Sequence, residues 1–263
     1  MAITAKDVQT LRQSTGVGMM DAKKALEAND GDMQAAVQWL RVQGLVSAAK
    51  RADREAGEGT VAVVRDGSVA AIVELRCETD FVAKSEEFVS LVDEIAARVC
   101  AEGEGATGQF QDAIEKMLTT LKENISIGRV YRLEAGEGEV IETYIHHQAG
   151  RGVNAVVVVV KNGTESVAHE IAVHVAFAKP LYLSREDVPV EEVNSERATV
   201  EEISRNEGKP EVAMAKIIEG RLNGWFKERV LLEQSYVKDE KQTIQQFLNG
   251  ASITAYAQVV VGG

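Results

Sequence analysis

The residues best suited to chemistry or to partner binding lie together at positions 78–84, in the stretch ETDFVAK. Before it, every second residue from Val69 to Cys77 is apolar, which predicts a strand. After it, apolar residues recur at helical spacing from Phe88 to Val99. Thr79 and Asp80 are residue types that begin helices. The stretch is therefore predicted to be a strand-to-helix turn, with a phenylalanine directly after its capping residues.

Two interpretations of Asp80 and Phe81 fit this pattern. Phe81 precedes Phe88 by seven residues, so it can belong to the buried face of the same helix, with Asp80 as the helix N-cap. Alternatively, the turn projects both side chains toward another protein. An exposed aromatic residue on a rigid turn is a typical binding hot spot, and the neighbouring carboxylate adds charge. Periodicity alone leaves both interpretations open.

Motifs for catalysis and for nucleotide binding are missing from the sequence. Residues 103–108, GEGATG, match the dinucleotide-binding pattern by letter, but they follow a predicted helix and not a strand. The phosphate-binding pattern GxxxxGK[ST] does not occur. Asp80 has no second catalytic group at a recognisable spacing. We therefore expect no catalytic residues and no direct nucleotide binding.

The histidines and cysteines are poorly spaced for binding a metal. The adjacent residues His146 and His147 lie on a predicted strand and point to opposite faces. His169 and His174 are five residues apart on a predicted helix. The two cysteines form no CxxC pair, and reduced thiols account for them. We expect neither a metal nor another cofactor.

Composition narrows the possible partners. The 263 residues carry 41 acidic and 29 basic side chains, a net charge of -12, which argues against broad contact with a nucleic-acid backbone. Aromatic residues make up 5% of the chain, too few for a base-stacking surface. No uncharged apolar stretch is long enough to span a membrane, and residues 1–7 contain no apolar core of a signal peptide. We expect a cytoplasmic protein with no nucleic-acid partner and no membrane contact.

The first half of the chain mixes helices with antiparallel strands. Residues 4–44 predict three short helices. A hairpin is predicted over residues 60–77, with a tight turn at Asp66-Gly67. The helix after position 84 is followed by a second helix at 110–122 and a strand at 129–133.

The second half repeats the plan of two strands followed by a helix. A charge-rich helix at 190–207 and a second helix at 212–222, joined at the GKP sequence of residues 208–210, then predict an antiparallel hairpin, and a last strand is expected to return to the second sheet. The fold class is α+β. The predicted segments are a three-helix domain at 1–46, a linker at 47–58, a first α+β subdomain at 59–136, a second at 137–183 and 233–263, and a coiled-coil-like helical hairpin at 184–232.

The sequence resembles the elongation factor Ts family along nearly its whole length. Besides TDFVAK at 79–84, the stretch TGVGMMDAKKAL at 15–26 is similar to the opening motif of that family. Further matches follow in the family's order: ENI and RV at 123–130, HVA and KP at 174–180, and GKP and EGR at 208–221. The resemblance implies an N-terminal ubiquitin-associated-like domain, then two related subdomains with antiparallel sheets and a projecting helical hairpin.

The resemblance also implies a function. Members of this family bind the translational GTPase elongation factor Tu with GDP and promote GDP release during translation elongation; they are exchange factors and not enzymes. The turn would then enter near the Mg²⁺ and the phosphates of the GTPase. The resemblance further implies that the partner-binding residues that dislodge the Mg²⁺ are Asp80, Phe81, Val82 and Ala83.

Other partner-binding residues carried over by the resemblance are Met19, Met20, Lys23 and His146. One of the two methionines is expected in the core, because adjacent residues of a helix cannot point the same way. The alternatives to His146 as a partner contact are its neighbour His147, since the loop that follows is one residue longer than in the family, and a purely structural histidine. Some family members have a further helix after the closing strand, and contacts of that helix are not expected here.

Two other classes of function remain as alternatives. The N-terminal helices alone are compatible with a non-enzymatic adaptor that binds ubiquitin-like proteins or peptides, but that leaves the rest of the chain unexplained. An enzyme using Asp80 as acid or base lacks a second catalytic group. Release of a fluorescent GDP from the GTPase, with and without this protein, separates the three.

Overall fold

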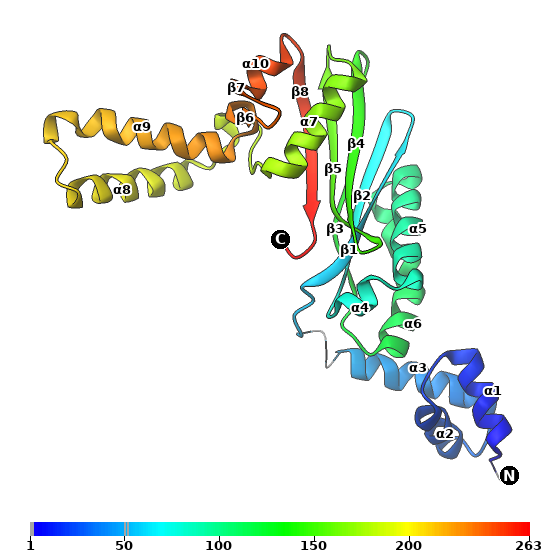
Figure 1. Cartoon of the computed structure of the whole chain (residues 1–263). Coiled ribbons are helices and arrows are strands. Elements are labelled where there is room, and N and C mark those ends of the chain that lie inside the picture. The colour runs from blue at the N-terminus through cyan, green and yellow to red at the C-terminus, as the bar shows by residue number, and fades with distance from the viewer. Residues whose placement is uncertain (1–2, 50, 52) are drawn as a thin grey trace.

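The computed structural model of the protein describes residues 3–49, 51 and 53–263. Three helices come first: α1 (Ala5–Thr15), α2 (Met19–Ala28) and α3 (Met33–Ala49). They enclose a small core of apolar side chains that includes Leu11, Leu26 and Leu40. Figure 1 shows this unit at one end of the molecule, below the sheets. The predicted three-helix unit is present.

Helix α3 is longer than the sequence suggested. It continues past Gly44 to Ala49, across the predicted boundary at residue 46, and the first strand begins at Glu58. A Cβ atom at Gly44 would lie 2.4 Å from the hydroxyl oxygen of Thr119. This glycine therefore allows two helices to approach closely; it does not end one.

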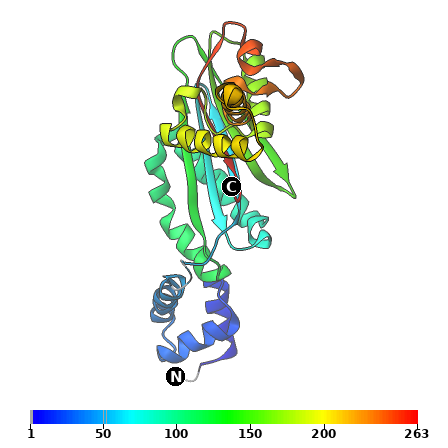
Figure 2. The ribbon, with the colours of Figure 1, turned by 90° about the vertical axis from the view of Figure 1, so that its left-hand side faces the viewer.

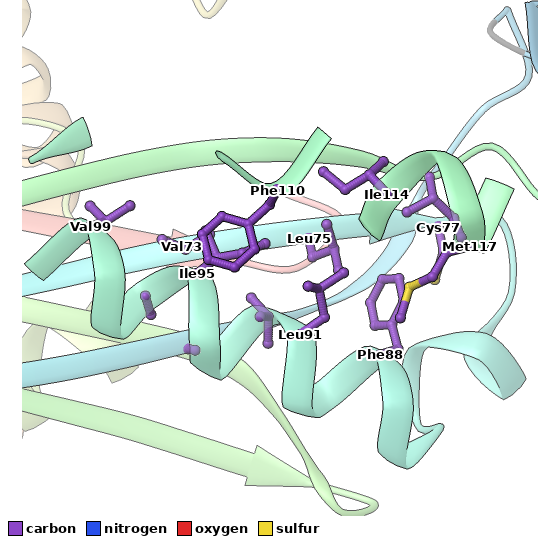
Figure 3. Packing of buried hydrophobic residues seen from close by; sticks show 14 of the residues in the cluster. Val73, Leu75, Cys77, Phe88, Leu91, Ile95, Val99, Phe110, Ile114 and Met117 are labelled. Carbon is purple, nitrogen blue, oxygen red and sulfur yellow. The ribbon is translucent and has the colours of Figure 1, made fainter. Parts of the chain in front are cut away.

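The first sheet has the order β1-β2-β3, formed by β1 (Glu58–Asp66), β2 (Val69–Cys77) and β3 (Ser126–Glu134). Asp66 pairs with Val69, so the predicted hairpin has a two-residue turn, at which Gly67 has φ 57°. The helices α4 (Asp80–Ala83), α5 (Glu86–Glu102) and α6 (Gln111–Leu121) follow β2, with a short helix η1 (Glu104–Phe110) between the last two. Figure 3 shows how α5 and the Phe110 and Ile114 side chains pack on β2.

The second sheet has the order β4-β5-β8, formed by β4 (Glu139–Gln148), β5 (Arg151–Lys161) and β8 (Ser252–Val260). Helix α7 (Glu165–Ala178) and the short α10 (Ile244–Leu248) cover one face. A small ribbon of β6 (Ser235–Tyr236) and β7 (Asp239–Thr243) lies beside them. The closing strand thus returns to the second sheet as predicted.

The two sheets pack face to face. Their shared core contains Val61 and Ile72 from the first sheet and Val157 and Val259 from the second. The strand β5 is buried almost throughout because one face lies against the first sheet and the other against α7. The layers are therefore α5 and α6, the first sheet, the second sheet, and α7 (Figure 1). The predicted α+β fold class is confirmed.

A helical arm projects from the second subdomain. It consists of α8 (Val190–Asn206) and α9 (Glu211–Arg229), with short helices η2 (Arg185–Asp187) and η3 (Leu231–Glu233) at its base. Figure 1 shows the arm extending away from the sheets; in Figure 2, turned by 90°, the arm points toward the viewer and lies in front of them. Helix α9 extends beyond the predicted end at Leu222, because its buried stripe continues to Phe226.

Candidate partner-binding site

The candidate site is built on α4, a single helical turn between β2 and α5. Thr79 is its N-cap, and the Thr79 hydroxyl oxygen accepts a hydrogen bond from the Val82 N–H at 3.4 Å. Ser85 then caps α5 separately, accepting from the Phe88 N–H at 3.4 Å. Two caps in succession mean that Phe81 does not lie on α5. The interpretation in which Asp80 is the N-cap is wrong, because Thr79 has that position and Asp80 is the first helical residue.

Phe81 is 84% exposed, although it is a large aromatic residue. This excludes the interpretation that Phe81 begins the buried face of α5. Phe88 is fully buried in the core of the first subdomain instead. Single exposed apolar side chains are common on protein surfaces, so the exposure of Phe81 leaves its ring available to a partner without identifying one.

Asp80 lies beside Phe81 and pairs with the ammonium of Lys84 at 2.5 Å. The hydrogen bond from Lys84 is the main reason that the pKa of the Asp80 carboxyl lies below its usual value. Asp80 is therefore ionised at neutral pH and held on the outer side of the turn.

A pair of glutamates fixes this turn to the loop that follows α6. One carboxylate oxygen of Glu123 accepts hydrogen bonds from the Glu78 N–H at 3.1 Å and the Thr79 N–H at 3.0 Å. Its other oxygen accepts from the Thr79 hydroxyl. In return, Glu78 accepts from the Asn124 N–H at 2.6 Å. Charge-assisted hydrogen bonds of this kind are strong, so they tie the backbone under Phe81 to the loop after α6.

Glu78 and Glu123 were missed as positioning residues in the sequence. The signal for one of them in the sequence is the ENI motif at 123–125, which contains Glu123. No local pattern predicts a contact between residues 44 positions apart.

Cys77 and Ala83 lie behind the turn. The Cys77 thiol donates to the Thr79 carbonyl at 3.2 Å, and burial raises its pKa to about 12, so it stays protonated. Ala83 is fully buried in the first core, while Val82 is partly buried against it. The buried methyl group of Ala83 supports the turn, and its inclusion among the partner-binding residues stays a prediction.

Met19 and Met20 lie in the first turn of α2, with Gly18 as N-cap. They are 50% and 73% exposed. The expectation that one of them fills the core was wrong: Ala22, Ala25 and Leu26 supply the buried face of this helix. Lys23 is half-exposed and pairs with Glu27 at 3.6 Å. The unit thus presents two flexible apolar side chains and one cation to its surroundings.

His146 and His147 lie at the end of β4, on either side of a β-bulge. His146 lines a hollow together with Tyr144 and Phe177, and Phe177 is 77% exposed. His147, the next residue of β4, is also exposed, and both histidines therefore remain candidates for the partner contact.

The structure brings some of these residues together and separates others. The β4–β5 turn and α4 lie at the same end of the two sheets (Figure 1). Met19, Met20 and Lys23 lie apart from them on the N-terminal unit, which contacts α6 through the ion pairs Arg41–Asp112 and Lys122–Asp21, both at 2.8 Å.

Residues 3–49, 51 and 53–263 contain no group of three or more His, Cys, Asp or Glu side chains that could hold a metal ion. Within the same ranges, no helix combines the length and the apolar character needed to cross a bilayer.

The sequence is similar to those of known proteins. The family model described as Elongation factor TS matches residues 78–263. A protein named Elongation factor Ts from Clavibacter michiganensis subsp. michiganensis is 45% identical over 273 residues, covering 98% of both chains. Proteins of the same name from Kineococcus radiotolerans and Micrococcus luteus are 42% and 41% identical, over 99% and 98% of each chain.

Proposed function

The chain belongs to the elongation factor Ts family, and from this premise we propose that it is the guanine-nucleotide exchange factor for the elongation factor Tu of its cell. The observation that carries the proposal is Phe81, exposed on a turn that Glu78 and Glu123 tie to the loop after α6. As an exchange factor it makes and breaks no covalent bond. It acts in translation elongation, in the cytoplasm.

Phe81 acts as a wedge. In GTPases of this kind, Mg²⁺ bridges phosphate oxygens and protein side chains, and a loop backbone surrounds the phosphates. A rigid aromatic side chain inserted beside that site displaces these ligands without touching the nucleotide. Binding energy of the factor for the GDP-free form then shifts the population toward it. Asp80 and the exposed part of Val82 accompany Phe81 into the contact.

The remaining segments have supporting parts in this proposal. The N-terminal unit, taken to residue 49, docks on the GTPase domain through Met19, Met20 and Lys23. The second subdomain, with His146 at its surface, reaches another domain of the same partner. The exposed methionines support the first of these contacts, because flexible thioether side chains adapt to a partner surface.

The test is the release of GDP. Elongation factor Tu loaded with a fluorescent GDP is mixed with excess unlabelled GDP, with and without this protein. We expect release to accelerate with the concentration of the factor and to reach a plateau. Release at the unassisted rate, with a factor shown to be folded by circular dichroism, would overturn the proposed function.

A further inference from the structure

The two subdomains meet closely where β1 crosses the start of β5. A Cβ atom at Gly152 would lie 2.2 Å from the carbonyl oxygen of Val61, so no larger residue fits at this crossing. The buried Thr60 hydroxyl donates a hydrogen bond to the Gly152 carbonyl at 3.1 Å. The β4–β5 hairpin is therefore held against β1 at one defined point.

Arg151 lies directly beside this crossing, and only 9% of it is exposed. One end of its guanidinium donates to the Gly59 carbonyl, and the other pairs with the Glu58 carboxylate at 2.7 Å. Its Nε is buried and has no hydrogen-bond partner among the described residues. Burial of an ion with an unsatisfied donor is unfavourable. Stability alone therefore gives no reason for an arginine here.

Arg151 is connected to the Phe81 turn through Glu58 and Cys77. Glu58 pairs with Cys77 in the register of β1 and β2, and the Cys77 thiol bonds to the Thr79 carbonyl. The charge of Arg151 also reaches the turn. The pKa of the Asp80 carboxyl is lowered mainly by the Lys84 hydrogen bond, and less by the charges of Lys84 and Arg151.

We propose that Arg151 is a positioning residue that fixes the β4–β5 hairpin, with His146, relative to the Phe81 turn, so that both contact the GTPase as one rigid surface. This inference rests on the proposed function. Two contacts held in a fixed geometry bind together without a further loss of conformational freedom. In the proposed function, the second subdomain holds the GTPase while Phe81 inserts into it, and this requires a fixed connection between the β4–β5 hairpin and the Phe81 turn.

The chain offers a matched control. Arg65, at the other end of β1, also joins the two subdomains, through Glu142 at 2.7 Å and Glu165 at 3.1 Å. Arg65→Met removes an intersubdomain arginine far along the strand from the turn. Arg151→Met removes all donors of the positioning residue, and Arg151→Lys keeps its charge. Melting curves and circular dichroism establish the folded fraction of each variant.

The first readout is GDP release over a range of factor concentrations. We expect Arg151→Met to lower the maximal release rate by about tenfold, the equivalent of about 1.4 kcal/mol, with a smaller change in half-saturating concentration. The maximal GDP-release rate with Arg65→Met should stay within about twofold of the rate with the wild type. Adding Phe81→Ala should reduce the maximal release rate by a smaller factor in Arg151→Met than in Arg65→Met, since the effects of coupled residues are not additive. A normal maximal rate for folded Arg151→Met, or full additivity with Phe81→Ala, would overturn the inference.

The second readout needs no GTPase. Titration of the Asp80 carboxyl by NMR should show a higher pKa in Arg151→Met than in the wild type, and an unchanged pKa in Arg65→Met and Arg151→Lys. An unchanged pKa in Arg151→Met contradicts the connection between Arg151 and the turn. If the wild-type protein fails to accelerate GDP release, the proposed function is wrong, while this titration still decides whether Arg151 governs the turn.

Discussion

Phe81 and Phe88 are seven residues apart, and helical periodicity treats them alike. The structure separates them completely, with Phe88 inside and Phe81 outside. The cause is local: Thr79 and Ser85 each begin a helix, so the chain turns twice within a few residues. The second cap could be anticipated from Ser85 in front of two glutamates. The Glu78–Glu123 contacts could not, since they join residues distant in the sequence.

The exposure of Phe81 leads to a prediction for a single side chain. Phe81→Ala should change the free energy of unfolding by no more than about 0.5 kcal/mol, because the ring has few neighbours to lose. The maximal rate of GDP release should fall strongly. Thermal melts and stopped-flow GDP release on the same sample measure both.

Phe88→Ala is the matched control, because it truncates the same residue type seven positions away. It should cost about 3 to 5 kcal/mol of stability, as truncation of a buried phenylalanine does. A large loss of stability in Phe81→Ala, with normal GDP release by the folded fraction, would leave Phe81 without a part in exchange.

At the scale of elements, the sequence indicated the order of helices and strands but not where some of them end. Helix α3 continues through Gly44 because the glycine permits contact with α6. Helix α9 continues to Arg229 because its buried stripe extends past Leu222. Both ends depend on packing against a distant element, for which one sequence contains no local signal.

Substitution of two glycines in α9 should stabilise the helix. Gly220 and Gly224 are exposed, and a Cβ atom at either would meet nothing within 4 Å. Alanine at each position should therefore stabilise the arm by about 0.8 to 1 kcal/mol, the difference in helix propensity. Hydrogen exchange of the α9 amides should slow by about fivefold for each change.

Gly16→Ala provides the contrast. Gly16 has φ 74°, and its Cβ would lie 3.1 Å from Thr120, so alanine should destabilise the N-terminal unit. Faster exchange of the α9 amides after Gly220→Ala or Gly224→Ala would contradict the expected gain.

A buried histidine holds the base of the arm. His174 is fully buried, with its Nε2 3.0 Å from the amide oxygen of Gln234, and the Gln234 amide donates to the carbonyls of Ala178 and Glu228. Burial lowers the pKa of His174 below its usual 6.5. The unfolded chain therefore binds a proton at a higher pH than the folded one.

Acid should destabilise the fold through His174. Above about pH 6.5 the histidine is neutral in both states and its contribution to stability is complete. As the pH falls below 6.5, only the unfolded state gains the proton, so the melting temperature should drop. His169→Gln removes an exposed histidine of the same helix and should leave the drop in place. A melting temperature that rises between pH 6.5 and 5.5 would show that His174 does not control this range.

At the scale of the whole molecule, the two sheets form one body and the N-terminal unit forms another. Arg129 joins the sheets: it pairs with the buried Glu74 at 2.9 Å and donates to the Val260 carbonyl at 2.6 Å. The N-terminal unit contacts the rest through α6, with exposed ion pairs of the kind that contribute little stability. The sequence anticipated the order of these bodies, but the face-to-face packing of the sheets came from the structure.

Removal of residues 1–53 should therefore leave the two sheets folded. The truncated protein should bind the GTPase more weakly, because Met19, Met20 and Lys23 are lost. Circular dichroism checks the fold, and titration calorimetry with elongation factor Tu measures the affinity. Unchanged affinity would mean that the N-terminal unit does not dock on the partner.

The place of β8 in the chain has a consequence for biosynthesis. The first sheet is complete once β3 has been synthesised. Strand β5 ends at residue 161, but its partner β8 begins only at residue 252. At about 5 to 20 residues per second, that is roughly 5 to 18 s. During this time the valine run 156–160 presents an unpaired apolar edge, which favours aggregation. A nascent chain of this translation factor thus passes through a vulnerable interval while the arm is being synthesised.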